Sequence, residues 1–313
     1  MKKILSRVIF VTLILSLTLL ALGATSTGRG CNCGMLTSFF QSCNPPEKPY
    51  EQEEDFIYFG EFPQTIKADS VEITEVQDGR GYYLGSDNFY YAKVEAIPYV
   101  GGYEFTTGEK ITIGREYYFK VEPIKWRILS KEDGNAFILC ENVLINKQYN
   151  SSYDNNYANS DIRWWLNNEF YYVAFSDQER EIIITTNVDN SAQTTYTPDY
   201  NENACENTSD KVFLLSYQET LNTEYGFSSD YESDTTRAKL TTDFARASGA
   251  KIDTSDSLYG KGFWWLRSPT SYYKSNVASV ESNGYAVGNY YYAEYFHVNI
   301  SHYGVVPAMN IKL

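Results

Sequence analysis

Histidine is scarce in this sequence, which has only two, His297 and His302, among 313 residues. In an uninterrupted strand, the alternation of side chains would place them on opposite faces. A zinc site needs about three or four converging ligands, so this pair alone does not predict one. No Ser-His-Asp or Cys-His order, G-x-S-x-G elbow or glycine-rich phosphate loop occurs. We therefore expect no catalytic residue, no metal and no cofactor, and predict that the protein is not an enzyme.

Basic residues are also few, with 26 Lys plus Arg against 40 Asp plus Glu and a formal net charge of −14. Binding to nucleic acid requires clustered basic residues, so we expect no nucleic-acid partner. The many carboxylates leave one enzymatic alternative open. A secreted hydrolase acting on carbohydrate would need two of them to face each other across a cleft.

Cysteine is limited to five residues without a C-x-x-C pair. Cys31, Cys33 and Cys43 follow the N-terminal segment, and Cys205 stands in a polar stretch. Cys140 ends an apolar run and is predicted to be a small buried residue. An odd count leaves at least one thiol unpaired, and the spacing does not determine which cysteines form disulfides.

Residues 8–24 form an uncharged run, and Lys2, Lys3 and Arg7 precede it. Its length lies between a signal-peptide core of about 7–15 residues and a membrane span of about 20. We interpret residues 1–24 as a signal peptide or an N-terminal membrane anchor. The rest is expected outside the cell or on its surface, with membrane contact only through this segment.

The remaining chain divides into a linker and one domain. Residues 25–55 are rich in Gly, Ser, Pro, Glu and Gln and are predicted to be a flexible linker. Residues 56–313 alternate strand patterns, hairpin turns and helix caps, including the turn at 132–134 and the capping boxes that begin at Ser176 and Ser216. This pattern predicts a single α+β domain of mainly antiparallel strands with two or three short helices.

What the chain has in excess is tyrosine, with 29 residues. Residues 271–303 hold eight Tyr, five Ser and four Asn, a composition typical of binding loops. The run Tyr290–Tyr292 cannot face one side of a strand only. We predict a ligand-binding surface in this block. Its residues are Tyr272, Tyr273, Asn276, Tyr290, Tyr291, Tyr292, Tyr295, His297, Asn299, His302 and Tyr303. The alternatives are a tyrosine-rich sheet that packs on itself and, for the site, the long polar segment 187–210.

Several short, distinct motifs follow one another along residues 56–313. They are Tyr58-Phe59-Gly60 with Phe62-Pro63-Gln64-Thr65, the segment 123–129, Ser160 to Phe175, the segment 210–216, Trp264 to Pro269, and Gly304-Val305 with Pro307-Ala308. With these motifs the chain resembles a bacterial family of exported proteins known only as a domain of unknown function. That family usually has Arg in its closing motif where this sequence has Val306.

The segment 264–269, the hairpins after it and the closing motif are similar to the C-type-lectin-like fold. The similar branch comprises formylglycine-generating enzymes and the variable proteins of diversity-generating retroelements. This resemblance implies a C-type-lectin-like domain that displays residues near its C-terminus. The enzyme branch uses a pair of C-terminal cysteines that is missing here, so its activity is not implied.

Tryptophan and arginine recur together in these motifs. Trp126, Trp164, Trp165, Trp264 and Trp265 are expected to lie mostly in the core. Three nearby arginines are expected to bind buried carbonyl or carboxylate oxygens. These are Arg127, Arg163 and Arg267.

Together, these patterns favour a cell-surface or secreted ligand-binding module. Its target is expected to be a protein or a carbohydrate, bound by the Tyr/Asn/Ser-rich surface. The alternatives are the carbohydrate hydrolase with two carboxylates and a purely structural surface module.

Overall fold

Strand β6, Glu116–Glu132, organises the main sheet of the computed structural model, which describes residues 48–289 and 297–313. Strand β2, Phe56–Ile66, pairs along one edge of β6. On the other edge, β5 (Tyr90–Glu95) pairs with the beginning of β6 and β7 (Asn135–Cys140) with its end. The length of β6 therefore lets one strand join three others.

The main sheet is antiparallel throughout and runs in the order β3-β4-β5-β6-β7-β18-β9, with β2 and then β1 attached to β6. The further strands are β1 (Glu51–Glu53), β3 (Ile73–Gln77), β4 (Tyr83–Gly85), β9 (Ile183–Ile184) and β18 (Ala308–Lys312). Strand β1 lies inside the segment 25–55 that was predicted as a linker, so strand pairing begins before Phe56.

The predicted hairpin turn between β6 and β7 is confirmed. Asp133 and Gly134 both have positive φ, 49° and 75°, which is the backbone conformation that a tight two-residue hairpin loop requires. The local sequence therefore determines where the chain reverses.

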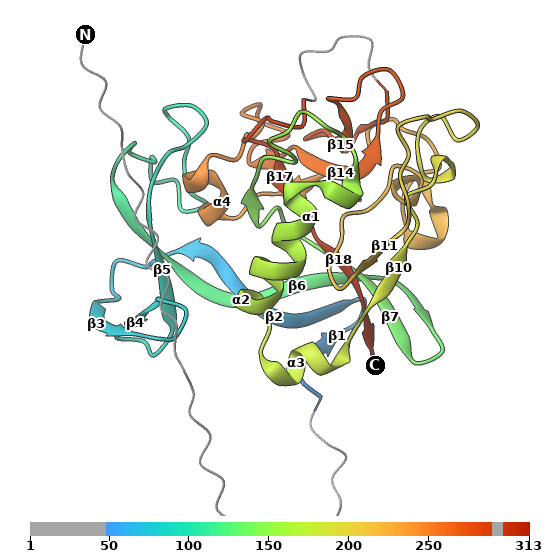
Figure 1. Cartoon of the computed structure of the whole chain (residues 1–313). Coiled ribbons are helices and arrows are strands. Elements are labelled where there is room, and N and C mark those ends of the chain that lie inside the picture. Colours follow the sequence, from blue (N-terminus) through green and yellow to red (C-terminus); the bar gives the residue numbers. More distant parts are fainter. Residues whose placement is uncertain (1–47, 290–296) are drawn as a thin grey trace, which may run out of the picture. The chain divides into compact units, whose positions relative to one another are not determined.

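A helical segment crosses the main sheet. It consists of α1 (Asp161–Trp165), a π-helical turn (Leu166–Phe170) and α2 (Tyr171–Ala174). In Figure 1 this segment runs from the upper part of the picture down to β2. Trp165 is 8% exposed, whereas its neighbour Trp164 is 58% exposed. The expectation that Trp164 lies in the core is wrong, because consecutive helical residues project in different directions.

Two further α-helices follow along the chain, the first at the capping box predicted at Ser176. Helix α3, Asp177–Ile182, begins with a complete capping box between Ser176 and Glu179. Helix α4, Asp243–Ser248, ends at Gly249, which has φ 112°. The remaining helical turns are 3₁₀: η1 (Tyr157–Asn159), η3 (Ala192–Thr194), η4 (Glu219–Leu221) and η5 (Thr223–Tyr225).

The second sheet has the order β16-β15-β14-β17-β8 and forms the upper part of Figure 1. Its strands are β8 (Ile145–Asn146), β14 (Trp264–Pro269), β15 (Val277–Val280), β16 (Ala286–Val287) and β17 (Gly304–Val305). Every residue of β14 is buried, including Trp264 and Trp265 at 0%. Because strand side chains alternate, burial of both rings means that both faces of β14 are covered.

Two small antiparallel ladders close long loops. Strand β10, Thr186–Val188, pairs with β11, Thr208–Asp210, and β12, Lys239–Leu240, pairs with β13, Lys261–Gly262. The first ladder joins the two ends of the polar segment 187–210. That segment is therefore a long loop whose two ends are paired at its base.

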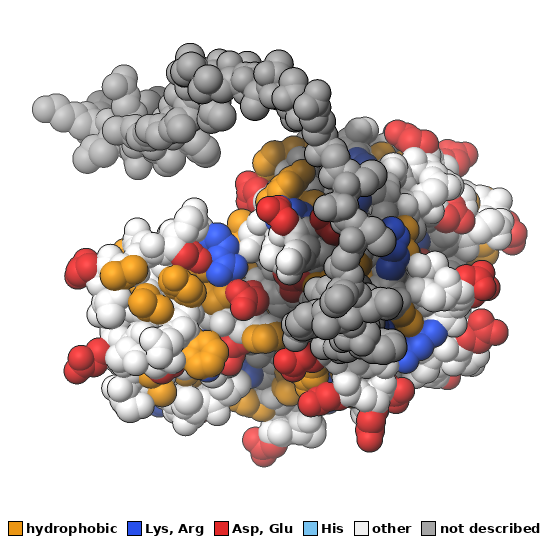
Figure 2. Space-filling model, turned by 90° about the horizontal axis from the view of Figure 1, so that it is seen from below, with side chains coloured by type: hydrophobic (Ala, Val, Ile, Leu, Met, Phe, Trp, Pro, Cys, Tyr) orange, Lys and Arg blue, Asp and Glu red, His pale blue; other side chains and the backbone are white. Residues whose placement is uncertain are grey.

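The expected α+β class with mostly antiparallel strands is confirmed. Asn276 and His297 form an isolated antiparallel bridge. Within residues 48–289 and 297–313, no helix is long and apolar enough to cross a membrane. Figure 2 shows acidic side chains spread over the face seen from below, with only scattered basic ones.

Candidate functional site

The predicted binding residues differ in exposure. Tyr272 and Tyr273 are exposed, at 57% and 40%. His297, Asn299 and His302 are half-buried. Asn276 and Tyr303 are buried, at 1% and 3%. The other four predicted residues lie outside the described residues; they are Tyr290, Tyr291, Tyr292 and Tyr295.

Asn276 and Tyr303 do not belong to an exposed face, which corrects the prediction for both. The Tyr303 ring centroid lies 4.6 Å from that of Trp265, and burial raises the pKa of its hydroxyl. Asn276 accepts a hydrogen bond from Ser275 through its side-chain oxygen, at 3.0 Å, and one from Asn155 through its backbone oxygen, at 2.7 Å. Both residues therefore hold the fold together around β14 and β17.

His302 also serves a structural contact. Its ring centroid lies 4.4 Å from that of Tyr99. Burial, and secondarily the charge of Lys251, lower the pKa of its imidazole to about 4. The ring is therefore neutral near pH 7.

An exposed group of tyrosines comes from three loops, 150–156, 196–205 and 270–276, which we call the tyrosine loops. Tyr153 is 59% exposed and Tyr200 is 64% exposed. Together with Tyr196, Tyr272 and Tyr273, they place five exposed phenol rings on these loops. Three of the rings, Tyr153, Tyr196 and Tyr200, come from outside the block 271–303.

Asparagine side chains, buried at Asn155 and Asn201 and half-buried at Asn203, hold the tyrosine loops together. Asn155 Nδ2 donates to the backbone oxygens of Thr270, Tyr273 and Asn276 at 3.3, 3.0 and 2.7 Å. Asn203 Nδ2 donates to Thr270 O at 2.8 Å. Asn201 Nδ2 donates to Pro269 O at 2.9 Å, at the end of β14. The amides replace a regular strand ladder and attach the first and second loops to the third.

This arrangement is suited to binding rather than to bond-making chemistry. Each tyrosine offers a flat apolar ring with a polar tip. The hydrogen bonds within and between the loops reduce the ordering that a ligand would otherwise have to impose.

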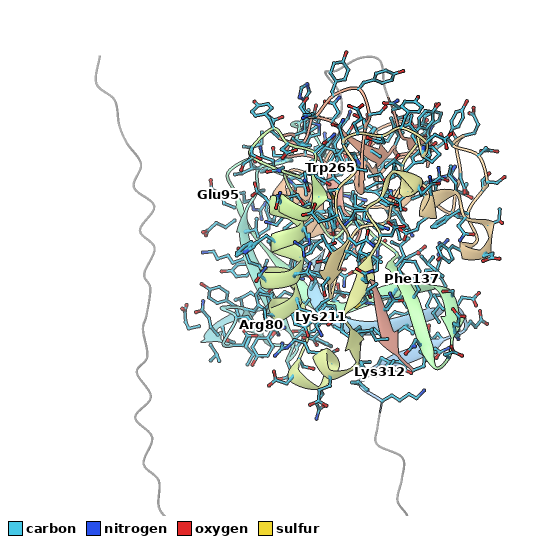
Figure 3. The ribbon with its side chains drawn as sticks, turned by 45° about the vertical axis from the view of Figure 1, so that its right-hand side comes forward. Arg80, Glu95, Phe137, Lys211, Trp265 and Lys312 are labelled. Atoms are coloured by element: carbon cyan, nitrogen blue, oxygen red, sulfur yellow. The ribbon has the colours of Figure 1, made fainter. Side chains whose placement is uncertain are left out.

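A second candidate is a cleft of about 710 Å³, which we call the side cleft. Its walls come from the β6–β7 hairpin, from residues 186–194, from the 3₁₀ turns η4 and η5 and from β18. Phe137, on β7, lines the cleft and lies toward the right of the view in Figure 3. The Phe137 ring stacks on Phe213 at 5.8 Å and meets Tyr225 edge-on at 5.4 Å.

The side cleft contains the buried guanidinium of Arg267. It donates to both carboxylate oxygens of Glu219, at 2.5 and 2.9 Å, and to Leu214 O at 2.7 Å. Glu219 also accepts from Ser216 N at 2.7 Å, while Ser216 Oγ accepts from Glu219 N. The predicted capping box at Ser216 is confirmed, and so is the predicted role of Arg267.

The other two arginines confirm the same expectation. Arg127 Nη2 lies 2.6 Å from a carboxylate oxygen of Glu141, and Arg163 Nε lies 2.7 Å from one of Asp210. Lys239 Nζ, 1% exposed, joins Glu141 at 3.0 Å, and burial lowers its pKa. Each of these cations is thus paired with a carboxylate within the fold.

Among residues 48–289 and 297–313, two carboxyl groups have a raised pKa, as a general acid would require. Burial raises the pKa of Asp210 despite the opposing effects of Thr208 and Arg163, and burial raises the pKa of Glu281. Neither residue lines the side cleft.

The cysteines of the described residues form no disulfide. Cys140 and Cys205 are both free thiols. Cys140 is 1% exposed, which confirms the prediction of burial, and burial raises its pKa to about 12.

Sequence reasoning did not identify the side cleft, because its walls are far apart in the chain. The available signal was the polar segment 187–210, whose first part lines the cleft while its middle forms the second tyrosine loop. A long polar segment of this kind often carries function.

Comparison with known proteins identifies a family. A family model described as Domain of unknown function (DUF6273) matches residues 133–313, from the β6–β7 turn to the end, and so contains all the tyrosine loops. No curated protein and no solved structure matches the chain.

Proposed function

The chain belongs to the family described as Domain of unknown function (DUF6273), and on that premise we propose that it is a ligand-binding module and not an enzyme. The observation that best supports this is the set of exposed rings on the tyrosine loops, with loops 150–156 and 196–205 attached to loop 270–276 by asparagine side-chain amides. The target is a protein or a carbohydrate.

The energetic argument rests on preorganisation. Immobilising a side chain on binding costs about 0.5–1.5 kcal/mol, so rings on ordered loops with few rotatable bonds lose less. Tyrosine is enriched among residues that dominate binding energy. Asn155 and Asn201 are 2% and 5% exposed, so their buried hydrogen bonds order the loops before a ligand binds.

The proposal extends to the cellular location of the protein and to the topology of its domain. Residues 1–24, outside the described residues, would export the domain or anchor it to the membrane, which makes the module extracellular or surface-bound. We also assign it a C-type-lectin-like topology. That assignment is supported by the order of β14, the β15–β16 hairpin and the closing strands β17 and β18, with the third tyrosine loop between β14 and β15.

The hydrolase alternative is less well supported. It requires two facing carboxyl groups at a cleft, one of them protonated. Asp210 has a raised pKa but is paired with Arg163 and Thr208, and it does not line the side cleft.

The test compares two sets of tyrosine substitutions. The first is Tyr153→Asn, Tyr200→Ser and Tyr273→Ser combined; Asn is chosen at 153 because φ there is 55°. The control is Tyr259→Ser, which removes a ring that is 39% exposed and lies outside the tyrosine loops. The probes are a glycan array and a library of folded extracellular proteins displayed on yeast.

We expect at least one ligand whose Kd rises by about tenfold or more in the combined variant, equivalent to about 1.4 kcal/mol. Its melting temperature and the binding of the control should be unchanged. If no probe binds, or if the combined variant binds as tightly as the wild type, the proposal is wrong and the structural-module alternative gains support.

A further inference from the structure

The side cleft is as large as a small-ligand site, but none of the exposed rings of the tyrosine loops lines it. Its volume of about 710 Å³ falls within the range of about 300–1,000 Å³ that is typical of small-ligand pockets. Its walls come from strands β6, β7, β10, β14 and β18 and from the segments 189–194 and 213–225. A site here would be separate from the proposed one.

The charge of the cleft excludes anionic ligands. Glu132, Asp189 and Glu219 line it together with a single cation, Arg267. That guanidinium is already used, because its nitrogens donate to Glu219, to Leu214 O and to Asp189 O. A phosphate or carboxylate would therefore meet uncompensated negative charge.

The hydrogen-bonding groups suit a hydroxylated ligand. The lining is rich in amide side chains, which both donate and accept hydrogen bonds, as hydroxyl groups do. Gln218 Nε2 donates to Thr195 O at 2.9 Å, and Gln193 Nε2 donates to Pro198 O at 3.2 Å. Asn310 Nδ2 donates to Thr186 Oγ1 at 3.0 Å. Each of these three amides is thus oriented by one hydrogen bond that its nitrogen donates. Its oxygen accepts no hydrogen bond from the described residues.

The apolar part of the lining suits the carbon face of a sugar. Tyr225 is half-buried, and its ring lies edge-on to Phe137 at 5.4 Å. Aromatic rings provide a flat apolar surface beside polar groups. From size, charge, amide groups and rings together, we propose that the side cleft binds a neutral oligosaccharide, independently of the tyrosine loops.

The experiment measures binding of defined sugars to the full chain by calorimetry. The neutral probes are cellotriose, maltotriose and tri-N-acetylchitotriose; the charged probes are a sulfated heparin disaccharide and trilysine. The cleft variant combines Glu132→Ala with Asn187→Ala, two exposed residues of the lining. Its matched control combines Asn168→Ala with Glu169→Ala, an exposed pair of the same residue types on the helical segment.

We expect at least one neutral trisaccharide to bind, the cleft variant to weaken that binding about tenfold or more, and the control pair to leave it unchanged. The combined tyrosine variant should retain the same affinity for it. The inference is overturned if no neutral probe binds, if a charged probe binds more tightly, or if the tyrosine variant rather than the cleft variant loses binding. In the last case the sugar binds the tyrosine loops, and the proposed function stands while the cleft site fails.

Discussion

Arg267 and Glu219 form a two-pronged ion pair that connects β14 to η4, with Nη1–Oε2 and Nη2–Oε1 distances of 2.5 and 2.9 Å. Arg267 is 2% exposed and its partner's side chain is 25% exposed. The same carboxylate closes the capping box at Ser216. One acidic residue therefore joins the second sheet to the wall of the side cleft.

Replacing Glu219 with Gln should destabilise the protein, because the buried Arg267 charge would lose its carboxylate. Removing one partner of a buried ion pair costs about 3–5 kcal/mol, and we expect about 3 kcal/mol here since water reaches Glu219. Urea denaturation measures the free energy of unfolding. Glu132→Gln, an exposed residue in the same cleft, is the control and should change it little; equal effects of the two variants would contradict the assignment.

The two tryptophans of β14 should each be essential to stability. Trp264 and Trp265 are 0% exposed, and their Nε1 atoms donate to Arg237 O at 3.2 Å and Lys147 O at 2.8 Å. Replacing either with Ala should lower the free energy of unfolding by about 3–5 kcal/mol. Trp164→Ala, which removes a ring that is 58% exposed, should change it by no more than about 0.5 kcal/mol. A ranking in which Trp164 matters most would refute the burial pattern.

Stability should fall in mild acid partly through His302. The pKa of its imidazole is lowered from 6.5 to about 4 by burial and by Lys251, so the unfolded chain binds a proton in this range that the folded chain does not. The contribution is fully present above pH 6.5 and is lost as the pH falls toward about 4. His302→Gln should therefore lose less stability than the wild type between pH 7 and about 4, measured by urea denaturation at several pH values. Parallel pH curves for the two proteins would show that His302 is not the group involved.

Local features of the structure were predictable from short sequence patterns. The capping box at Ser176 and the turn at 132–134 depend on side chains and backbone preferences within a few residues. The partners of Arg127, Arg163 and Arg267 were predictable by type, since a buried guanidinium requires oxygen acceptors. Which oxygens they are depends on the fold.

The candidate sites were less accessible to sequence reasoning. The tyrosine-rich composition of residues 271–303 pointed to the third tyrosine loop, but Tyr153 and Tyr200 join it from distant parts of the chain. Asn155 brings the first of these loops to residues 270–276 through hydrogen bonds that span more than a hundred residues of sequence. Contacts of that range have no local signature.

By itself, the sequence determined the α+β class, the hairpins and caps, the acidic character and the excess of tyrosine, because these depend on composition and on neighbouring residues. Only the tertiary structure decided that Tyr303 is a core residue while Tyr272 is exposed. Both have the same side chain and follow two polar residues in the sequence. Tyr303 precedes β17 and packs on Trp265, whereas Tyr272 lies on a loop beyond the end of β14. Burial is set by which segments the fold places over a residue, and that placement arises from contacts distant in the chain.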